Sequence, residues 1–180
     1  MRMDQLTSKL QAALADAQSM ALGNDNNFIE PVHLVLALLD QRGGSVRPLL
    51  SQTGFNIQEL RDGLQAIVKR LPTVEGTGGD VAMSNELGRL LNQADKISQK
   101  GGDKYISSET VLLAAMSDKG EMGKLLNSFG VSEKALENAI RNLRGGDKVT
   151  DAGAEDAFQA LQIYCMMIII RNEKINLNPV

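Results

Sequence analysis

The stretch Phe28-Ile-Glu-Pro-Val-His-Leu-Val-Leu-Ala-Leu-Leu39 decides the fold, because the chain contains a second version of it. That version, Tyr105-Ile-Ser-Ser-Glu-Thr-Val-Leu-Leu-Ala-Ala-Met116, lies 77 residues further along. In both, an aromatic residue and an isoleucine lead into a nearly continuous apolar run. Such a run, apolar almost all round, predicts a buried central helix. Because internal repeats set the architecture of a chain, the rest of the sequence is best interpreted outward from this pair.

The duplication extends in both directions from these two stretches. Upstream, the same offset pairs apolar residues: Leu6 with Met83, Leu10 with Leu87, Leu14 with Leu91, Ala17 with Ala94 and Met20 with Ile97. Downstream, one deleted residue reduces the offset to 76, and the duplication pairs Leu49-Leu50 with Leu125-Leu126, Gly54 with Gly130 and Leu60 with Leu136. The repeated positions are apolar, as a shared core requires, since buried volume cannot diverge freely. The sequence therefore predicts an all-α protein with two pseudo-symmetric four-helix repeats.

Breaks in the apolar pattern predict the domain organisation. We expect a first four-helix repeat at 1–71, a linker rich in Gly and Thr at 72–82, and a second repeat at 83–144. The duplicated pattern ends at Leu143, so we expect 145–180 to be a linker and a divergent or truncated tail that adds little to the core. Expected helix N-caps are Asn56, Ser84, Ser107 or Ser108, and Ser132.

Composition excludes several classes of function. The net charge is −3 and the 19 basic residues are scattered, which argues against a nucleic-acid partner. No stretch approaches the roughly 18 apolar residues of a membrane span, and no secretory signal opens the chain. The single Cys165 cannot form an intramolecular disulfide, which fits a reducing cytoplasm.

Known catalytic and cofactor motifs are also missing from the sequence. The Gly-rich Gly76-Thr-Gly-Gly79 lacks the Lys-[Ser/Thr] of a phosphate-binding loop, and the Gly123-Lys124 pair continues into Leu125. His33 is the only histidine and falls in an apolar helix, where a structural role is favoured over a catalytic one. We therefore expect no cofactor, no metal and no enzymatic activity.

Two acidic residues interrupt the duplication. Asp103 and Glu109 flank the turn into the second apolar helix, and their counterparts in the first repeat are Asn26 and Val32. One interpretation is that Glu109 complements the helix dipole and Asp103 is a solvated loop charge. The other is that both acids rim a binding groove, because a duplicated scaffold has become asymmetric there. Thr7, which pairs with Ser84, is either part of that site or only a helix-terminal hydroxyl.

Several motifs together resemble a known family. They are Met1-Arg-Met-Asp-Gln-Leu-Thr7, Phe28-Ile-Glu-Pro-Val-His-Leu34, Val74-Glu-Gly-Thr-Gly-Gly-Asp80, Tyr105-Ile-Ser-Ser-Glu109 and Gly153-Ala-Glu-Asp156. These motifs closely resemble the N-terminal domain of the ClpB family of ATP-driven protein disaggregases, from Met1 to about Leu161. The resemblance implies a double Clp repeat domain that engages unfolded or aggregated polypeptides and passes them to a hexameric ring of AAA+ modules. Those modules are not in this chain, so we expect the isolated chain to be a monomer.

The same resemblance implies a substrate site. The polar positions of the family map onto Thr7, Asp103 and Glu109, and its apolar groove maps onto Leu91, Ile97 and their neighbours. Two positions depart from the family pattern, since Gln93 and Thr110 stand where apolar residues are usual. Polar groups there would weaken the attraction for apolar segments.

The tail departs from the family pattern. It reads Gln162-Ile-Tyr-Cys-Met-Met-Ile-Ile-Ile-Arg171 where the family has a polar, charged helix.

Two other functions remain open at this point. The first alternative is the related N-terminal domain of a Clp protease ATPase subunit, which binds dedicated adaptors. A more remote alternative is a small enzyme that uses Asp103 and Glu109 as an acid and base pair.

Overall fold

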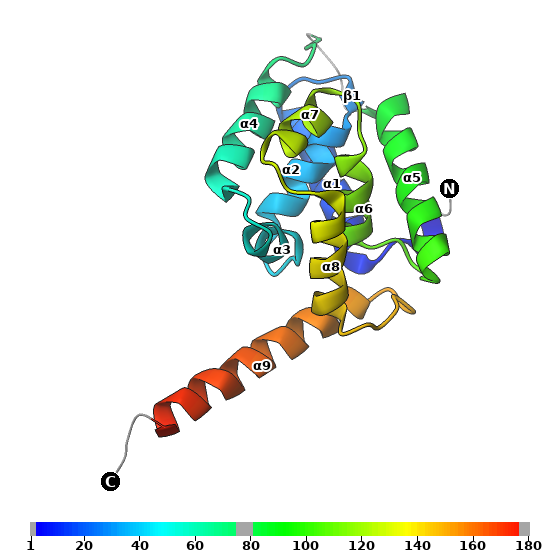
Figure 1. Ribbon diagram of the computed structural model, residues 1–180. Coiled ribbons are helices and arrows are strands. Elements are labelled where there is room, and N and C mark those ends of the chain that lie inside the picture. Colours follow the sequence, from blue (N-terminus) through cyan, green and yellow to red (C-terminus); the bar gives the residue numbers. More distant parts are fainter. Residues whose placement is uncertain (1–2, 75–80, 177–180) are drawn as a thin grey trace.

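The computed structural model describes residues 3–74 and 81–176, and these are helical apart from turns, loops and two short strands (Figure 1). The first repeat consists of α1 (Ser8–Gly23), α2 (Pro31–Asp40), α3 (Val46–Gln52) and α4 (Ile57–Lys69). The second consists of α5 (Asn85–Gly101), α6 (Ser108–Met116), α7 (Glu121–Ser128) and α8 (Glu133–Arg144). The remaining elements are a 3₁₀ turn η1 (Met3–Gln5), strands β1 (Phe28–Ile29) and β2 (Ala82–Met83), and α9 (Ala154–Asn176). The predicted all-α fold with two four-helix repeats is confirmed.

Polar side chains fix where most of these helices begin. At each N-cap a side-chain oxygen accepts the backbone N–H three residues on, which satisfies one of the free amides of the first turn. The caps of this kind are Thr7, Asn56, Ser84, Ser107 and Ser132, before α1, α4, α5, α6 and α8. The expected caps Asn56, Ser84 and Ser132 are therefore present, and Ser107 rather than Ser108 caps α6.

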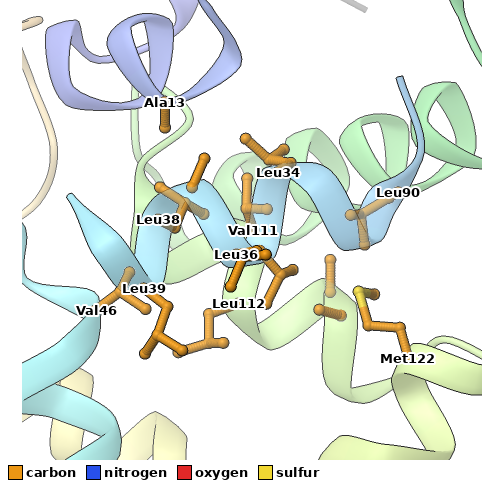
Figure 2. Close-up of a cluster of buried hydrophobic side chains, with 14 of the residues drawn as sticks. Ala13, Leu34, Leu36, Leu38, Leu39, Val46, Leu90, Val111, Leu112 and Met122 are labelled. Carbon is orange, nitrogen blue, oxygen red and sulfur yellow. The ribbon is translucent and has the colours of Figure 1, made fainter. Parts of the chain in front are cut away.

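The two duplicated apolar helices form the centre of the molecule. Every residue of α2 from Val32 to Leu39 is buried, and so is every residue of α6. α2 packs on α1 and α6 packs on α5, while α2 and α6 also contact each other. Figure 2 shows side chains of both helices, among them Leu36, Leu38 and Leu112, gathered in one cluster. The central position of these helices explains why they must be apolar on all sides.

The two repeats are interleaved through their backbones. The segment before α1 pairs in parallel with the segment before α6, at Leu6 and Ile106. Reciprocally, β2 before α5 pairs in parallel with β1 before α2, where Met83 lies opposite Ile29. Contacts of α4 with α7 and of α3 with α8 are exchanged in the same reciprocal way. As a result, the two repeats share a single core.

The structure differs from expectation at both predicted linkers. The first linker ends in ordered structure, because Val81 is buried and β2 pairs with β1, while 75–80 lie outside the described residues. After α8 the chain also stays packed: Val149, Ala154 and Phe158 form a small buried cluster with Tyr105 beside it. These residues have no counterpart in the duplication, so the repeat pattern could not reveal them.

Beyond Phe158, α9 projects away from the body of the molecule (Figure 1). Its apolar side chains are largely exposed: Leu161, Ile163, Tyr164, Met166, Met167, Ile168, Ile169 and Ile170. Cys165, in the same stretch, is a free and exposed thiol. No helix within the described ranges combines the length and the apolar character needed to cross a membrane.

Candidate functional site

A mostly buried arginine, Arg144, bonds several polar residues where the second repeat meets the segment after α8. Arg144, the last residue of α8, donates from Nη1 to Asp103 Oδ2 at 2.9 Å and from Nη2 to Ser107 Oγ at 2.7 Å. Nη2 also lies 3.4 Å from Glu109 Oε2. The Arg144 side chain is only 11% exposed, so these charge-assisted bonds are shielded from water. Arg144 thereby connects the two acidic residues that interrupt the duplication.

Glu109 is held from both repeats. It is a first-turn residue of α6 with no exposed surface. Its Oε2 faces Arg144, while its Oε1 accepts a hydrogen bond of 2.9 Å from the hydroxyl of Ser45, just before α3. A buried carboxylate requires such partners, because an unpaired charge in the interior is very costly.

Thr7 belongs to a second polar group, which adjoins the first at the start of α6. Its hydroxyl donates to Glu155 Oε1, and that carboxylate oxygen also accepts the backbone N–H of Ser108 at 2.9 Å. Glu155 is 2% exposed. Burial, followed by the nearby charge of Glu109, raises the pKa of Glu155 to about 7, although the bonds from Thr7 and Ser108 oppose the shift.

The structure thus places Thr7, Asp103 and Glu109 in two adjoining polar groups at the start of α6, mostly in the interior. Thr7 and Glu109 have no exposed surface, and the Asp103 carboxylate is 6% exposed. Asp103 is therefore not the solvated loop charge of the first interpretation, and Glu109 is buried rather than exposed on a groove rim. Sequence reasoning missed Arg144 and Glu155, because each meets its partners only through long-range folding. One signal was available: Glu155 lies in the motif Gly153-Ala-Glu-Asp156.

A groove adjoins this network between α5, α6 and α8. It has a volume of about 410 Å³, and its apolar lining comes from Ile97, Leu113 and Ile140. Asp103 and Arg144 line it as well, so the ion pair forms part of its wall. Ile97, predicted for the groove, lies in it and is partly buried. Leu91 is fully buried in the core and is not among the lining residues.

The two polar substitutions lie in different places. Thr110 lines the groove, but its hydroxyl is bonded to Ser107 Oγ at 3.0 Å and lies 3.4 Å from Arg144 Nη2. Gln93 instead lines a second hollow of about 560 Å³, together with Leu90. The polar group of Thr110 is therefore already satisfied by the network, which reduces its effect on an apolar ligand.

The acidic residues of the site are arranged as an ion-pair network around Arg144. Asp103 and Glu109 both bind Arg144, which is the geometry of a structural ion-pair network rather than of an acid and base pair. Among the residues that the structure describes, no group of three or more His, Cys, Asp or Glu could hold a metal ion.

His33 has a structural role, as its sequence context favours. Its Nδ1 accepts the N–H of Glu30 at 2.9 Å, and its Nε2 lies 3.1 Å from Asn26 Oδ1. These partners fit the neutral ring with the proton on Nε2. Burial, which disfavours the charged form, lowers the pKa of His33 to about 4.

Comparison with known proteins defines the class of this domain. Residues 5–146 match the model of the Clp repeat N-terminal domain family, and the chain belongs to that family. Over all 180 residues it is 57% identical to the chaperone protein ClpB of Pseudomonas putida and 51% identical to that of Vibrio cholerae. The chain spans only 21% of the length of each of these two relatives. The resemblance to ClpB inferred from the motifs is confirmed.

Solved structures agree on the fold. The Hsp104 N-terminal domain of Candida albicans superposes with a TM-score of 0.73 at 18% identity, covering 84% of this chain and 99% of that one. The N-domain of ClpV from Vibrio cholerae gives a TM-score of 0.66 at 22% identity, with 77% and 84% covered.

Proposed function

We propose that this chain is the substrate-receiving N-terminal domain of an ATP-driven Clp chaperone of the disaggregase type. In this role it binds unfolded or aggregated polypeptides in the cytoplasm and has no catalytic activity of its own. Its partners are those polypeptides and the ring-forming AAA+ modules of a longer protein. The family match and the 57% identity to a ClpB chaperone support the proposal.

The groove between α5, α6 and α8 is the observation that carries the proposal. Its volume of about 410 Å³ lies in the lower part of the usual range for ligand pockets, which suits a few side chains of an extended segment. Ile97, Leu113 and Ile140 offer apolar contact, while Asp103 and Arg144 offer groups that can bond a peptide backbone.

Binding at this groove should be weak. Burying apolar surface contributes roughly 25 cal/mol per Å², but ordering a flexible polypeptide offsets much of that gain. We therefore expect micromolar or poorer affinity. Weak affinity suits a domain that must release its substrate to a motor.

The predicted site residues have distinct roles in this proposal. Asp103 lines the groove and can contact the polypeptide directly. Glu109 cannot contact the polypeptide, because the Glu109 carboxylate is fully buried, and it instead positions Arg144 through their ion pair. Thr7 acts one step further away, through Glu155 and the start of α6. Leu91 is buried in the core on α5, so its role is to hold in place the helix that carries Ile97.

The test replaces Ile97 with Gln and measures binding of an unfolded model polypeptide by fluorescence anisotropy. We expect affinity to fall about tenfold or more, equivalent to about 1.4 kcal/mol, because the apolar floor of the groove is lost. Ile57→Gln is the matched control, since Ile57 is also a partly buried isoleucine packed on the core but lies on α4. Equal affinity of the two variants would contradict the proposal.

The adaptor hypothesis makes the opposite prediction about the ligand. A disaggregase domain should bind the unfolded form of the model polypeptide and should not bind its native form. Tighter binding of natively folded proteins, still reduced by Ile97→Gln, would favour an adaptor-binding domain instead.

A further inference from the structure

The first turn of α9 carries a carboxylate that is inserted between two helix N-termini. Glu155 Oε1 accepts hydrogen bonds from Thr7, the N-cap of α1, and from the N–H of Ser108, the first residue of α6. The duplication shows why this contact exists only once. The position equivalent to Ser108 in the first repeat is Pro31, which has no N–H to donate.

The surrounding segment is attached to the same two places. The N–H of Ser8 donates to Ala152 O at 2.8 Å, and the N–H of Lys104 donates to Val149 O at 2.8 Å. Segment 149–158 therefore bridges the start of α1 and the turn before α6. Glu155 provides its fully buried polar contact.

From this geometry we infer that Glu155 is a latch: its carboxyl holds segment 149–158 against both repeats and so fixes how α9 leaves the body of the molecule. The inference is independent of what the groove binds, because the latch lies between α1 and α6 rather than in the lining of the groove.

The environment of Glu155 makes this latch sensitive to protonation. Its second oxygen, Oε2, is buried and has no hydrogen-bond partner, which is costly for a charged carboxylate. The charged group that acts on it is Glu109 on α6, which repels it, while the guanidinium of Arg144 on α8 is engaged by Asp103 and Glu109. On the α1 side, Lys9 pairs instead with the exposed Asp156. The neutral form of Glu155 is therefore the form that the docked state favours.

The sign of the pH dependence follows from the two states. The pKa of Glu155 is raised from 4.5 to about 7 when docked, so the docked segment binds more protons than the released one between these values. Docking is then strongest below about pH 4.5 and weakens by about tenfold for each pH unit between 5 and 7. Above about pH 7 it levels off.

Amide hydrogen exchange of the full chain, followed by NMR between pH 5.5 and 7.5, tests the latch. The Ser8 and Lys104 amides report release, because their acceptors lie in segment 149–158. After correction for intrinsic exchange rates, their protection should fall by about tenfold from pH 5.5 to 6.5, relative to amides inside α2. Constant protection across this range would overturn the inference.

Variants separate the latch from a merely structural contact. Glu155→Gln should keep both amides protected at every pH, because it imitates the neutral acid, whereas Glu155→Ala should lose that protection at every pH. Asp156→Asn, which removes the adjacent exposed carboxylate, should retain the pH profile of the parent. If Glu155→Gln keeps that pH profile too, or if it exposes both amides throughout, Glu155 is not the latch.

Discussion

The N-termini of α2 and α6 occupy equivalent places in the two repeats, yet they are stabilised in different ways. At α2 the contacts are local: Pro31 needs no acceptor for an N–H, and His33 bonds Glu30 and Asn26 within the same turn. At α6 the polar groups reach far along the chain, since Ser108 bonds Glu155 and Glu109 bonds a residue of each repeat.

This difference shows where the duplicated scaffold became specialised. The backbone pairing is the same on both sides, because Thr7 donates its N–H to Ile106 O just as Ser84 donates to Ile29 O. Asp103 and Glu109 have no acidic counterparts at the equivalent positions of the first turn, Asn26 and Val32, and Asp103 bonds α8 while Ser108 bonds the start of α9. The groove lies beside the second turn, so asymmetry and candidate function coincide.

The largest effect is expected when the second turn receives the residue that the first turn has at the equivalent position, Val32, as in Glu109→Val. We expect a loss of about 3 kcal/mol in the free energy of unfolding, because Arg144 loses a buried partner and the Ser45 hydroxyl loses its acceptor. Urea denaturation followed by circular dichroism measures the change.

Glu86→Val is the matched control for this replacement. Glu86 is also a first-turn acid, but it lies on α5 with its side chain 54% exposed and pairs with the exposed Arg89. Its replacement should change stability by no more than about 0.5 kcal/mol. If Glu109→Val is equally mild, the buried network contributes nothing and the two turns do not differ in energy.

The first turn can be tested through His33, the only histidine in the chain. Its pKa is lowered by burial from 6.5 to about 4, so the folded state binds fewer protons than the unfolded state between these values. Stability should therefore fall as the pH drops, by about 2 kcal/mol between pH 6 and 4.5. NMR titration of the ring protons measures the pKa directly.

The contribution of Glu155 has the opposite sign in part of this range, so stability is best compared in a Glu155→Gln background. There, His33→Thr, which introduces the residue found at the equivalent position 110, should flatten the acid limb of the stability profile. A His33 ring that titrates near its ordinary value of 6.5 would contradict the buried, neutral assignment.

The sequence predicted what depends on local pattern and repetition. The apolar runs of α2 and α6 and the caps Asn56, Ser84 and Ser132 follow from spacing alone, and the structure contains them. The family motifs indicated which polar residues would come together. Their burial was not predictable, because it depends on the docking of segment 149–158 over Thr7 and Ser108.

Long-range contacts account for the other differences. Arg144 resembles a solvated charge in the last turn of an amphipathic helix, and only folding brings it to Asp103, 41 residues away. The strand pairing of Ile29 with Met83 involves two residues in each strand, too few to leave a periodic signal. Leu91 and Ile97 lie on the same helix, but only the structure shows that one faces the core and the other the groove.

The smallest expected effect concerns the ends of α1 and α5, where the duplication places Asp25 opposite Gly102. Both have a left-handed backbone, with φ of 53° at Asp25 and 78° at Gly102, although only glycine adopts this conformation without steric cost. Asp25→Gly should therefore stabilise the protein slightly, by about 0.5 kcal/mol, because relief of strain is partly offset by the greater freedom of glycine in the unfolded chain.

The reciprocal change, Gly102→Asp, should cost about 1 kcal/mol. A Cβ at this position would also come within 2.6 Å of Lys148 Nζ, but that group is the end of a flexible side chain and can move away. Urea denaturation of the two variants and of the double swap measures these changes. If Asp25→Gly destabilises the protein as much as Gly102→Asp does, backbone conformation does not set the difference between these helix ends, and the exposed Asp25 side chain must stabilise its turn in another way.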